Sequence, residues 1–272
     1  MQARSALFDL FGDHLRPRGG RAPIAALVRL LAPIGIAAPA VRTAVSRMVR
    51  QGWLVPVRLP GGPGYQLTVK AVHRLDEAAA RIYRTNRPAW DGQFDLLVLS
   101  AAQRRTDRAR LHATLAYLGY ATLDETTWVS PRPTDEAVSV LTEAGVAFER
   151  FAASHADGLP GAAAMVRRAW NLGALAEAYD RFVADLTPVM TGNAVPPVRT
   201  PGSALADEAA YAARFQLVHA WRSFLFRDPQ LPPALLPEPW AGATAAAFFD
   251  QHEARLRPAA DRFVDRCLPK GS

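Results

Sequence analysis

Apolar residues recur at helical spacing through the first 85 residues and predict three short helices, a two-stranded hairpin and a fourth helix. The third helix is expected over residues 39–51, and Gly52 directly after it is a common helix stop. The hairpin is expected to have strands at 54–59 and 65–68 and a turn at 60–64. This order of elements is typical of a winged helix-turn-helix.

The middle of the chain, beyond a linker at residues 86–88, alternates apolar runs with amphipathic stretches in the order βαββαβ. Strands are expected at 94–100, 120–123, 127–130 and 146–151, and helices at 107–118 and 134–144. That order predicts a small ferredoxin-like domain. From about residue 159 the pattern becomes wholly helical, with proline-rich connectors. Helices are expected at 162–171, 175–186, 203–225 and 240–267.

The predicted fold class is therefore α+β and multidomain. It combines a winged helix-turn-helix DNA-binding domain over residues 1–85, a ferredoxin-like domain over 90–155 and a helical C-terminal domain over 159–272. Half of the residues are hydrophobic, which is enough to bury a core. No apolar run reaches the ~18 residues that a membrane helix needs, so we expect a cytoplasmic protein without membrane contact.

The third predicted helix carries two different faces. An apolar stripe at i, i+3, i+4 and i+7 suits packing against the second helix and consists of Val41, Ala44, Val45 and Met48. A polar, acid-free face consists of Arg42, Thr43, Ser46, Arg47 and Arg50. Such a face favours entry into the major groove of DNA, with Arg42 and Arg47 at base edges and Arg50 at the backbone. The alternative is an ordinary amphipathic helix with a solvated basic side.

Three further arginines are candidate DNA contacts outside this helix. Arg58 precedes the tip of the hairpin, and Arg16 and Arg18 lie in an Arg/Gly-rich loop that offers phosphate contacts. The tip itself has no basic residue, which weakens the expected contribution of the wing.

The net charge of the chain is concentrated at its N-terminus. Residues 1–60 hold nine arginines and two acidic residues and so carry the whole net charge of +7. The remaining residues are neutral on balance. A basic module on a neutral body indicates a polyanionic partner, and with the helix pattern it favours double-stranded DNA.

Enzymatic chemistry finds little support in the sequence. The only cysteine, Cys267, excludes an intramolecular disulfide and a cysteine metal cluster, and the six histidines are dispersed. There is no phosphate-binding loop and no dinucleotide-binding glycine motif. We expect no catalytic residues, no metal and no cofactor.

Three segments resemble the PaaX-type transcriptional repressors. The segment Ala-Val-Arg-Thr-Ala-Val-Ser-Arg-Met-Val-Arg-Gln-Gly-Trp-Leu at 40–54 resembles the recognition-helix segment of that family, and so does Phe-Gly-Asp-His-Leu-Arg-Pro-Arg-Gly-Gly at 11–20. The segment at 217–232 resembles the C-terminal block of the family. The resemblance implies a Cas2-like fold for the central domain. It also implies a homodimeric repressor of phenylacetic acid degradation genes, released from its operator by the effector phenylacetyl-CoA.

One C-terminal group of residues is a candidate ligand site for an aromatic acyl-CoA. It combines aromatic and cationic side chains and consists of His219, Trp221, Arg222 and Arg227. The alternative is that Trp221 packs in a helical core while the two arginines form ion pairs.

A Cas2-like domain also raises the alternative of a metal-dependent nuclease. Such an enzyme needs acidic ligands near the end of the first strand, where this chain has Ser100. The next acidic residue, Asp107, lies inside a predicted helix. We therefore expect the domain to serve as a scaffold.

Overall fold

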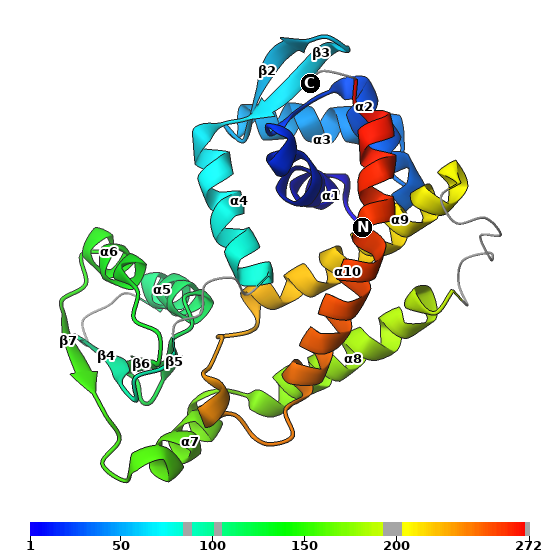
Figure 1. Cartoon of the computed structure of the whole chain (residues 1–272). Helices are drawn as coiled ribbons and strands as arrows, with labels where there is room; N and C mark the ends of the chain where they lie inside the picture. The colour runs from blue at the N-terminus through cyan, green and yellow to red at the C-terminus, as the bar shows by residue number, and fades with distance from the viewer. Residues whose placement is uncertain (84–88, 101–104, 193–202, 270–272) are drawn as a thin grey trace. The chain divides into compact units, whose positions relative to one another are not determined.

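Two units, each built from segments far apart in sequence, make up the chain. The computed structural model describes residues 1–83, 89–100, 105–192 and 203–269 (Figure 1). The first unit comprises Met1–Asn86, Arg181–Leu225 and Ala245–Ser272, and the second comprises Arg87–Asp180 and Phe226–Thr244. The predicted helical region beyond residue 159 thus contributes to both units. No helix among the described residues is both long and apolar enough to cross a membrane.

The N-terminal part of the first unit consists of four α-helices and a small antiparallel sheet. The helices are α1 (Ala3–Asp9), α2 (Ile24–Leu31), α3 (Ala38–Arg50) and α4 (Val69–Ile82). A π-helical turn (Leu10–Leu15) and a 3₁₀ turn (Arg16–Arg18) continue α1. The strands are β1 (Arg21–Pro23), β2 (Leu54–Leu59) and β3 (Gly62–Leu67), in the order β1-β3-β2. Pro39 lies in the first turn of α3, and no side chain caps this helix.

The turn predicted at residues 60–64 is shorter in the structure, because β3 already begins at Gly62. Within this strand, Gly64 stands where no side chain would fit. A Cβ atom on Gly64 would lie 2.7 Å from the carbonyl oxygen of Ala22 and 2.6 Å from the Cδ1 atom of Leu59. The glycine therefore lets β1 approach β3 closely, and glycines that suggest a turn in the sequence belong to a strand.

The core of the first unit joins both ends of the chain. Leu7, Leu10 and Phe11 from the N-terminal helix are buried in it, together with Tyr211 and Phe263 from two C-terminal helices. These helices are α9 (Ala204–Trp221) and α10 (Ala241–Cys267), which Figure 1 shows against α1 and α2. The N-terminal helices thus share their core with helices from the C-terminal part of the chain.

The second unit contains a four-stranded antiparallel sheet. The strands are β4 (Phe94–Leu99), β5 (Ala121–Thr122), β6 (Thr127–Ser130) and β7 (Phe148–Ala153), in the order β5-β6-β4-β7. The helices are α5 (Arg105–Tyr117), α6 (Asp135–Glu143), α7 (Gly158–Ala169) and the first half of α8 (Leu172–Met190). One cluster of buried residues joins Leu97 and Trp128 of the sheet to Leu115 of α5. Another joins Phe94 to Met165 of α7.

Candidate functional site

The helix α3 separates buried from exposed residues along its length. Its buried residues are Val41, Ala44, Val45 and Met48, and its exposed ones include Arg42, Thr43, Ser46, Arg47 and Arg50. Burial of side chains such as Val41 and Met48 contributes roughly 1.5–3 kcal/mol each and holds the helix on the core. The helix contains no acidic residue. Its polar face thus carries three arginines and no acidic residue.

The chain directly after α3 keeps this helix in place. Gly52 has φ +72°, a left-handed conformation that lets the chain reverse after the helix. Trp53 then packs edge-on against Phe8 of α1, with ring centroids 4.8 Å apart. Arg58 is exposed on β2, opposite Pro63 of β3.

Arg16 and Arg18 are engaged within the first unit. Arg16 forms an ion pair with Asp76 and donates from Nε to the Gly12 carbonyl. The Arg18 guanidinium lies 2.9 Å from Asp261 and 2.8 Å from Asp265 on α10. Both arginines thus have acidic partners, whereas Arg42, Arg47 and Arg50 of α3 form no ion pair with any residue that the structure describes.

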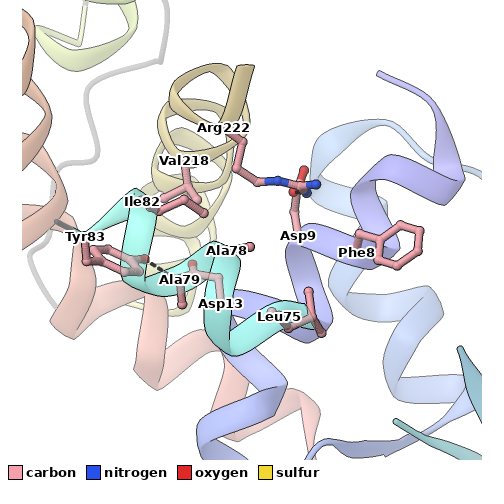
Figure 2. Close-up of a pocket in the computed structure, with 11 residues that line it drawn as sticks. Phe8, Asp9, Asp13, Leu75, Ala78, Ala79, Ile82, Tyr83, Val218 and Arg222 are labelled. Atoms are coloured by element: carbon pink, nitrogen blue, oxygen red, sulfur yellow. Dashed lines mark hydrogen bonds and ion pairs between the residues drawn. The ribbon is translucent and has the colours of Figure 1, made fainter. Parts of the chain in front are cut away.

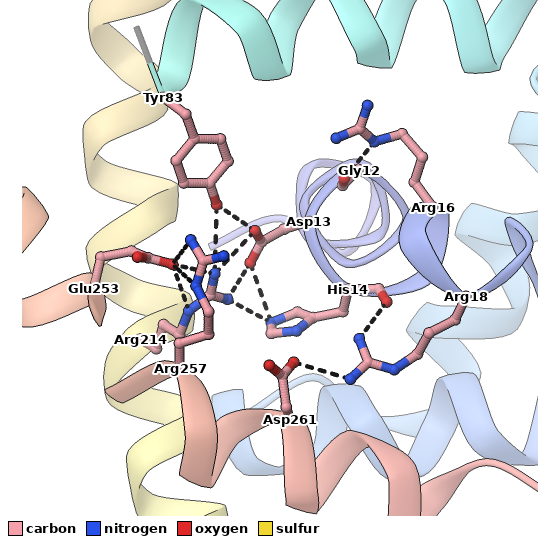
Figure 3. A network of polar contacts seen from close by, with 10 residues as sticks. All are labelled: Gly12, Asp13, His14, Arg16, Arg18, Tyr83, Arg214, Glu253, Arg257 and Asp261. Atoms are coloured by element: carbon pink, nitrogen blue, oxygen red, sulfur yellow. Dashed lines mark hydrogen bonds and ion pairs between the residues drawn. The ribbon is translucent and has the colours of Figure 1, made fainter. Parts of the chain in front are cut away.

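A buried charge network ties the N-terminal helix to α9 and α10 (Figure 3). At its centre, Arg214 of α9 forms ion pairs with Asp13 and with Glu253 of α10, the latter at 2.6 Å. Tyr83, at the end of α4, donates a hydrogen bond to Asp13. The side chains of Arg214 and Glu253 are 4% and 7% exposed. Because a buried charge is costly without a partner, loss of any one of these contacts should destabilise the packing of these helices.

Protonation in this network follows from burial and from the neighbouring charges. Burial lowers the pKa of His14 to about 4, so its imidazole is neutral at pH 7. Burial alone would raise the pKa of Asp13, but His14 and Arg214 outweigh it and hold that pKa well below its usual value. Asp13 is therefore ionised, and Arg214 lies between two carboxylates.

A second buried pair lies one helical turn earlier. Asp9 forms an ion pair with Arg222, and the Nδ1 atom of His219 lies 2.5 Å from its carboxylate. Figure 2 shows the Arg222 guanidinium beside Asp9 at a small cavity lined also by Leu75 and Val218. The cavity has a volume of about 30 Å³, which is room for water rather than for an aromatic ring.

Trp221 is a core residue. Its side chain is 6% exposed, its Nε1 atom donates to the Ile82 carbonyl at 3.1 Å, and its ring stacks on Phe249 with centroids 4.9 Å apart. Arg227, the fourth candidate for ligand binding, is exposed and belongs to the second unit. Three of the four candidates are therefore held within the packed first unit.

Three family models match successive parts of the chain. They are described as PaaX-like protein (residues 2–71), PaaX protein central Cas2-like domain (87–163) and PaaX-like protein C-terminal domain (170–266). The Transcriptional repressor PaaX of Escherichia coli (strain K12) is 33% identical over 265 residues, which is 96% of this chain and 82% of the relative. The chain belongs to the PaaX family of transcriptional repressors.

Membership of the PaaX family places the chain among transcription regulators rather than enzymes. It confirms the predicted Cas2-like central domain and helical C-terminal region. A solved structure, the Uncharacterized protein Rv0674 from Mycobacterium tuberculosis, matches with a TM-score of 0.65 at 22% identity. That match covers 98% of each chain and shows that the fold is shared along the whole length.

Two of the PaaX-like segments line the same small cavity of the first unit. Asp13 comes from the segment 11–20, and Val218 and Arg222 come from the segment 217–232. Sequence reasoning overlooked the acidic partners of these segments, although a signal existed. Asp9 and Asp13 are the only acidic residues among the first 60, and both lie within the apolar N-terminal helix pattern. Buried charges of this kind require partners.

The burial of these two acids leaves the surface of the PaaX-like N-terminal region positively charged. Because the side chains of Asp9 and Asp13 are 2% and 10% exposed and bind Arg222 and Arg214, they offset little of the surrounding arginine charge. In the second unit, Asp95 of β4 is likewise buried and held by Arg150 at 2.8 Å and by Tyr120. Asp95 thus has a structural role within the sheet.

Proposed function

We propose that the chain is a winged helix-turn-helix repressor that reads its operator with α3. In this assignment α2 and α3 form the helix-turn-helix, β2 and β3 form the wing, and the DNA-binding domain spans residues 1–85. The observation that carries the proposal is the exposed, acid-free face of α3 above its buried apolar stripe. A helix of this kind fits the major groove, where base edges carry a readable pattern of donors and acceptors.

Each residue of this face has a proposed role. Arg42 and Arg47 bind guanine edges through paired hydrogen bonds, because a guanidinium matches the O6 and N7 acceptors. Thr43 and Ser46 contact base edges or phosphates, and Arg50 contacts phosphates. These assigned contacts are Arg42, Thr43, Ser46, Arg47 and Arg50 on α3, with Arg58 on the wing. We assign a smaller share of phosphate binding to Arg16 and Arg18, since carboxylates already offset their charge.

The rest of the chain would supply dimerisation and regulation. We propose a homodimer on a palindromic operator, because two-fold proteins read two-fold sites. The strand order β5-β6-β4-β7 with antiparallel pairs supports a ferredoxin-like arrangement of the central domain at 90–155, followed by a helical domain at 159–272. The likeness of the segments 11–20, 40–54 and 217–232 to PaaX-type repressors supports phenylacetic acid degradation genes as targets and phenylacetyl-CoA as the releasing effector.

Fluorescence anisotropy on DNA from upstream of its own gene tests the proposal. We expect salt-dependent binding, release by phenylacetyl-CoA, and no release by free CoA or phenylacetate. The variant Arg47→Ala should weaken binding by roughly 1–3 kcal/mol, while Arg110→Ala, an exposed arginine on α5, should bind as the wild type does. Absence of DNA binding would refute the function, and binding that ignores the thioester would refute only the effector.

A further inference from the structure

A wide aromatic groove lies in the second unit. It has a volume of about 720 Å³, within the range of small-molecule sites and far above that of the cavity beside Asp9. Its walls come from α5, β5, β6, the α7–α8 junction and residues 226–229. The lining side chains with aromatic or cationic character include His112, Tyr117, Trp128, Trp170, Phe226 and Arg227.

Two features of this groove fit a planar aromatic group with a polar attachment. Tyr117 and Phe226 stack with ring centroids 5.7 Å apart, and Phe226 is 64% exposed, a large apolar side chain left in water. Trp128 is only 2% exposed, and its Nε1 atom has no hydrogen-bond acceptor among the described residues. A buried N–H without an acceptor is costly, and a ligand oxygen would remove that cost.

A second hollow adjoins the groove and has the opposite character. It has a volume of about 620 Å³ and shares residues 169–171 with the groove. Arg167 and Arg168 line it, both exposed at the end of α7 and neither in an ion pair with a residue that the structure describes. Two neighbouring guanidinium groups provide a fork of donors that suits phosphate oxygens.

We propose that the groove and this hollow form one elongated site for an aromatic acyl-CoA thioester. The aromatic acyl group occupies the groove, and the phosphates of the CoA bind Arg167 and Arg168. Trp170 lies between the two parts, because it lines both. This assignment rests on the proposed function and gives its effector a location in the second unit. It also gives Arg227 a place in the site, near the aromatic end.

Isothermal titration calorimetry of the full-length protein with phenylacetyl-CoA and with free CoA separates the two ends of the site. Phe226→Ala should weaken the binding of phenylacetyl-CoA at least roughly fivefold and leave the binding of CoA unchanged. The double variant Arg167→Ala/Arg168→Ala should weaken both ligands at least roughly tenfold. Arg110→Ala removes an exposed arginine of the same unit outside both hollows and should bind both ligands as the wild type does. Circular dichroism melting curves check that each variant is folded.

The outcomes test the location of the site separately from the identity of the effector. Wild-type affinity for phenylacetyl-CoA in both the Phe226 and the double arginine variants would overturn the site and leave the effector assignment intact. An equal loss for Arg110→Ala would show that general charge, not this site, controls binding. If the wild-type protein does not bind phenylacetyl-CoA, the effector assignment fails and the site fails with it.

Discussion

Replacing Arg214 with methionine should destabilise the first unit more than any single change on its surface. The substitution keeps much of the side-chain volume but leaves Asp13 and Glu253 without the guanidinium that lies 2.6 Å from Glu253. Removing one partner of a buried ion pair costs about 3–5 kcal/mol, because the remaining charge is stranded in the core. At about 2–4 °C per kcal/mol for a unit of this size, the Tm should fall by roughly 6–20 °C.

The same network provides a control for this change. Arg257 also contacts Glu253, at 2.7 Å, but its side chain is 51% exposed. Arg257→Met should therefore cost less than about 1 kcal/mol. Differential scanning calorimetry of both variants at pH 7 measures the two shifts. If Arg214→Met lowers the Tm no more than Arg257→Met does, the buried network does not stabilise the packing of α9 and α10 on the N-terminal helix.

Two further predictions concern pH and backbone packing in the first unit. The pKa of His14 is lowered to about 4, so the unfolded chain binds an extra proton between pH 6.5 and 4 and stability is lost as the pH falls through that window. The free energy of unfolding should fall by about 3 kcal/mol across this window. Urea titrations at several pH values should show a smaller fall for His14→Gln. An equal fall in that variant would show that other groups cause the loss. Gly64→Ala should lower the Tm by several degrees, since its Cβ would overlap Ala22 and Leu59. Gly173→Ala, where a Cβ has room, is the control and should leave the Tm nearly unchanged, so equal shifts would contradict the steric reasoning.

The helix α3 was predictable because its evidence is local. Four apolar residues at helical spacing place one face of α3 on the core, and the basic face follows from the remaining positions. The βαββαβ order could also be predicted, because each element carries its own periodicity. The role of Gly64 was not predictable, because it depends on a distant part of the chain. Gly64 is required by the approach of β1, whose Pro23 pairs with it from 41 residues earlier in the sequence.

The shared core of α9, α10 and the N-terminal helix could not be predicted from periodicity. Helical spacing indicates that a face is buried but not which distant helix covers it. The charges contained a partial signal, since Asp9 and Asp13 lie within an apolar helix pattern and require buried cations. Their partners Arg222 and Arg214 are eight residues apart on and just after α9, a match that only the structure reveals.

The most direct test of operator reading by α3 measures binding to every single base-pair variant of the footprinted operator, for the wild type and for Arg47→Ala. We predict that the wild type discriminates at each half-site by roughly 1–3 kcal/mol per base pair, and that Arg47→Ala loses discrimination at one position in each half-site. Loss of affinity that is uniform across all sequences would show that Arg47 contacts phosphate. Unchanged affinity and discrimination would contradict the assignment of α3 as the reading helix.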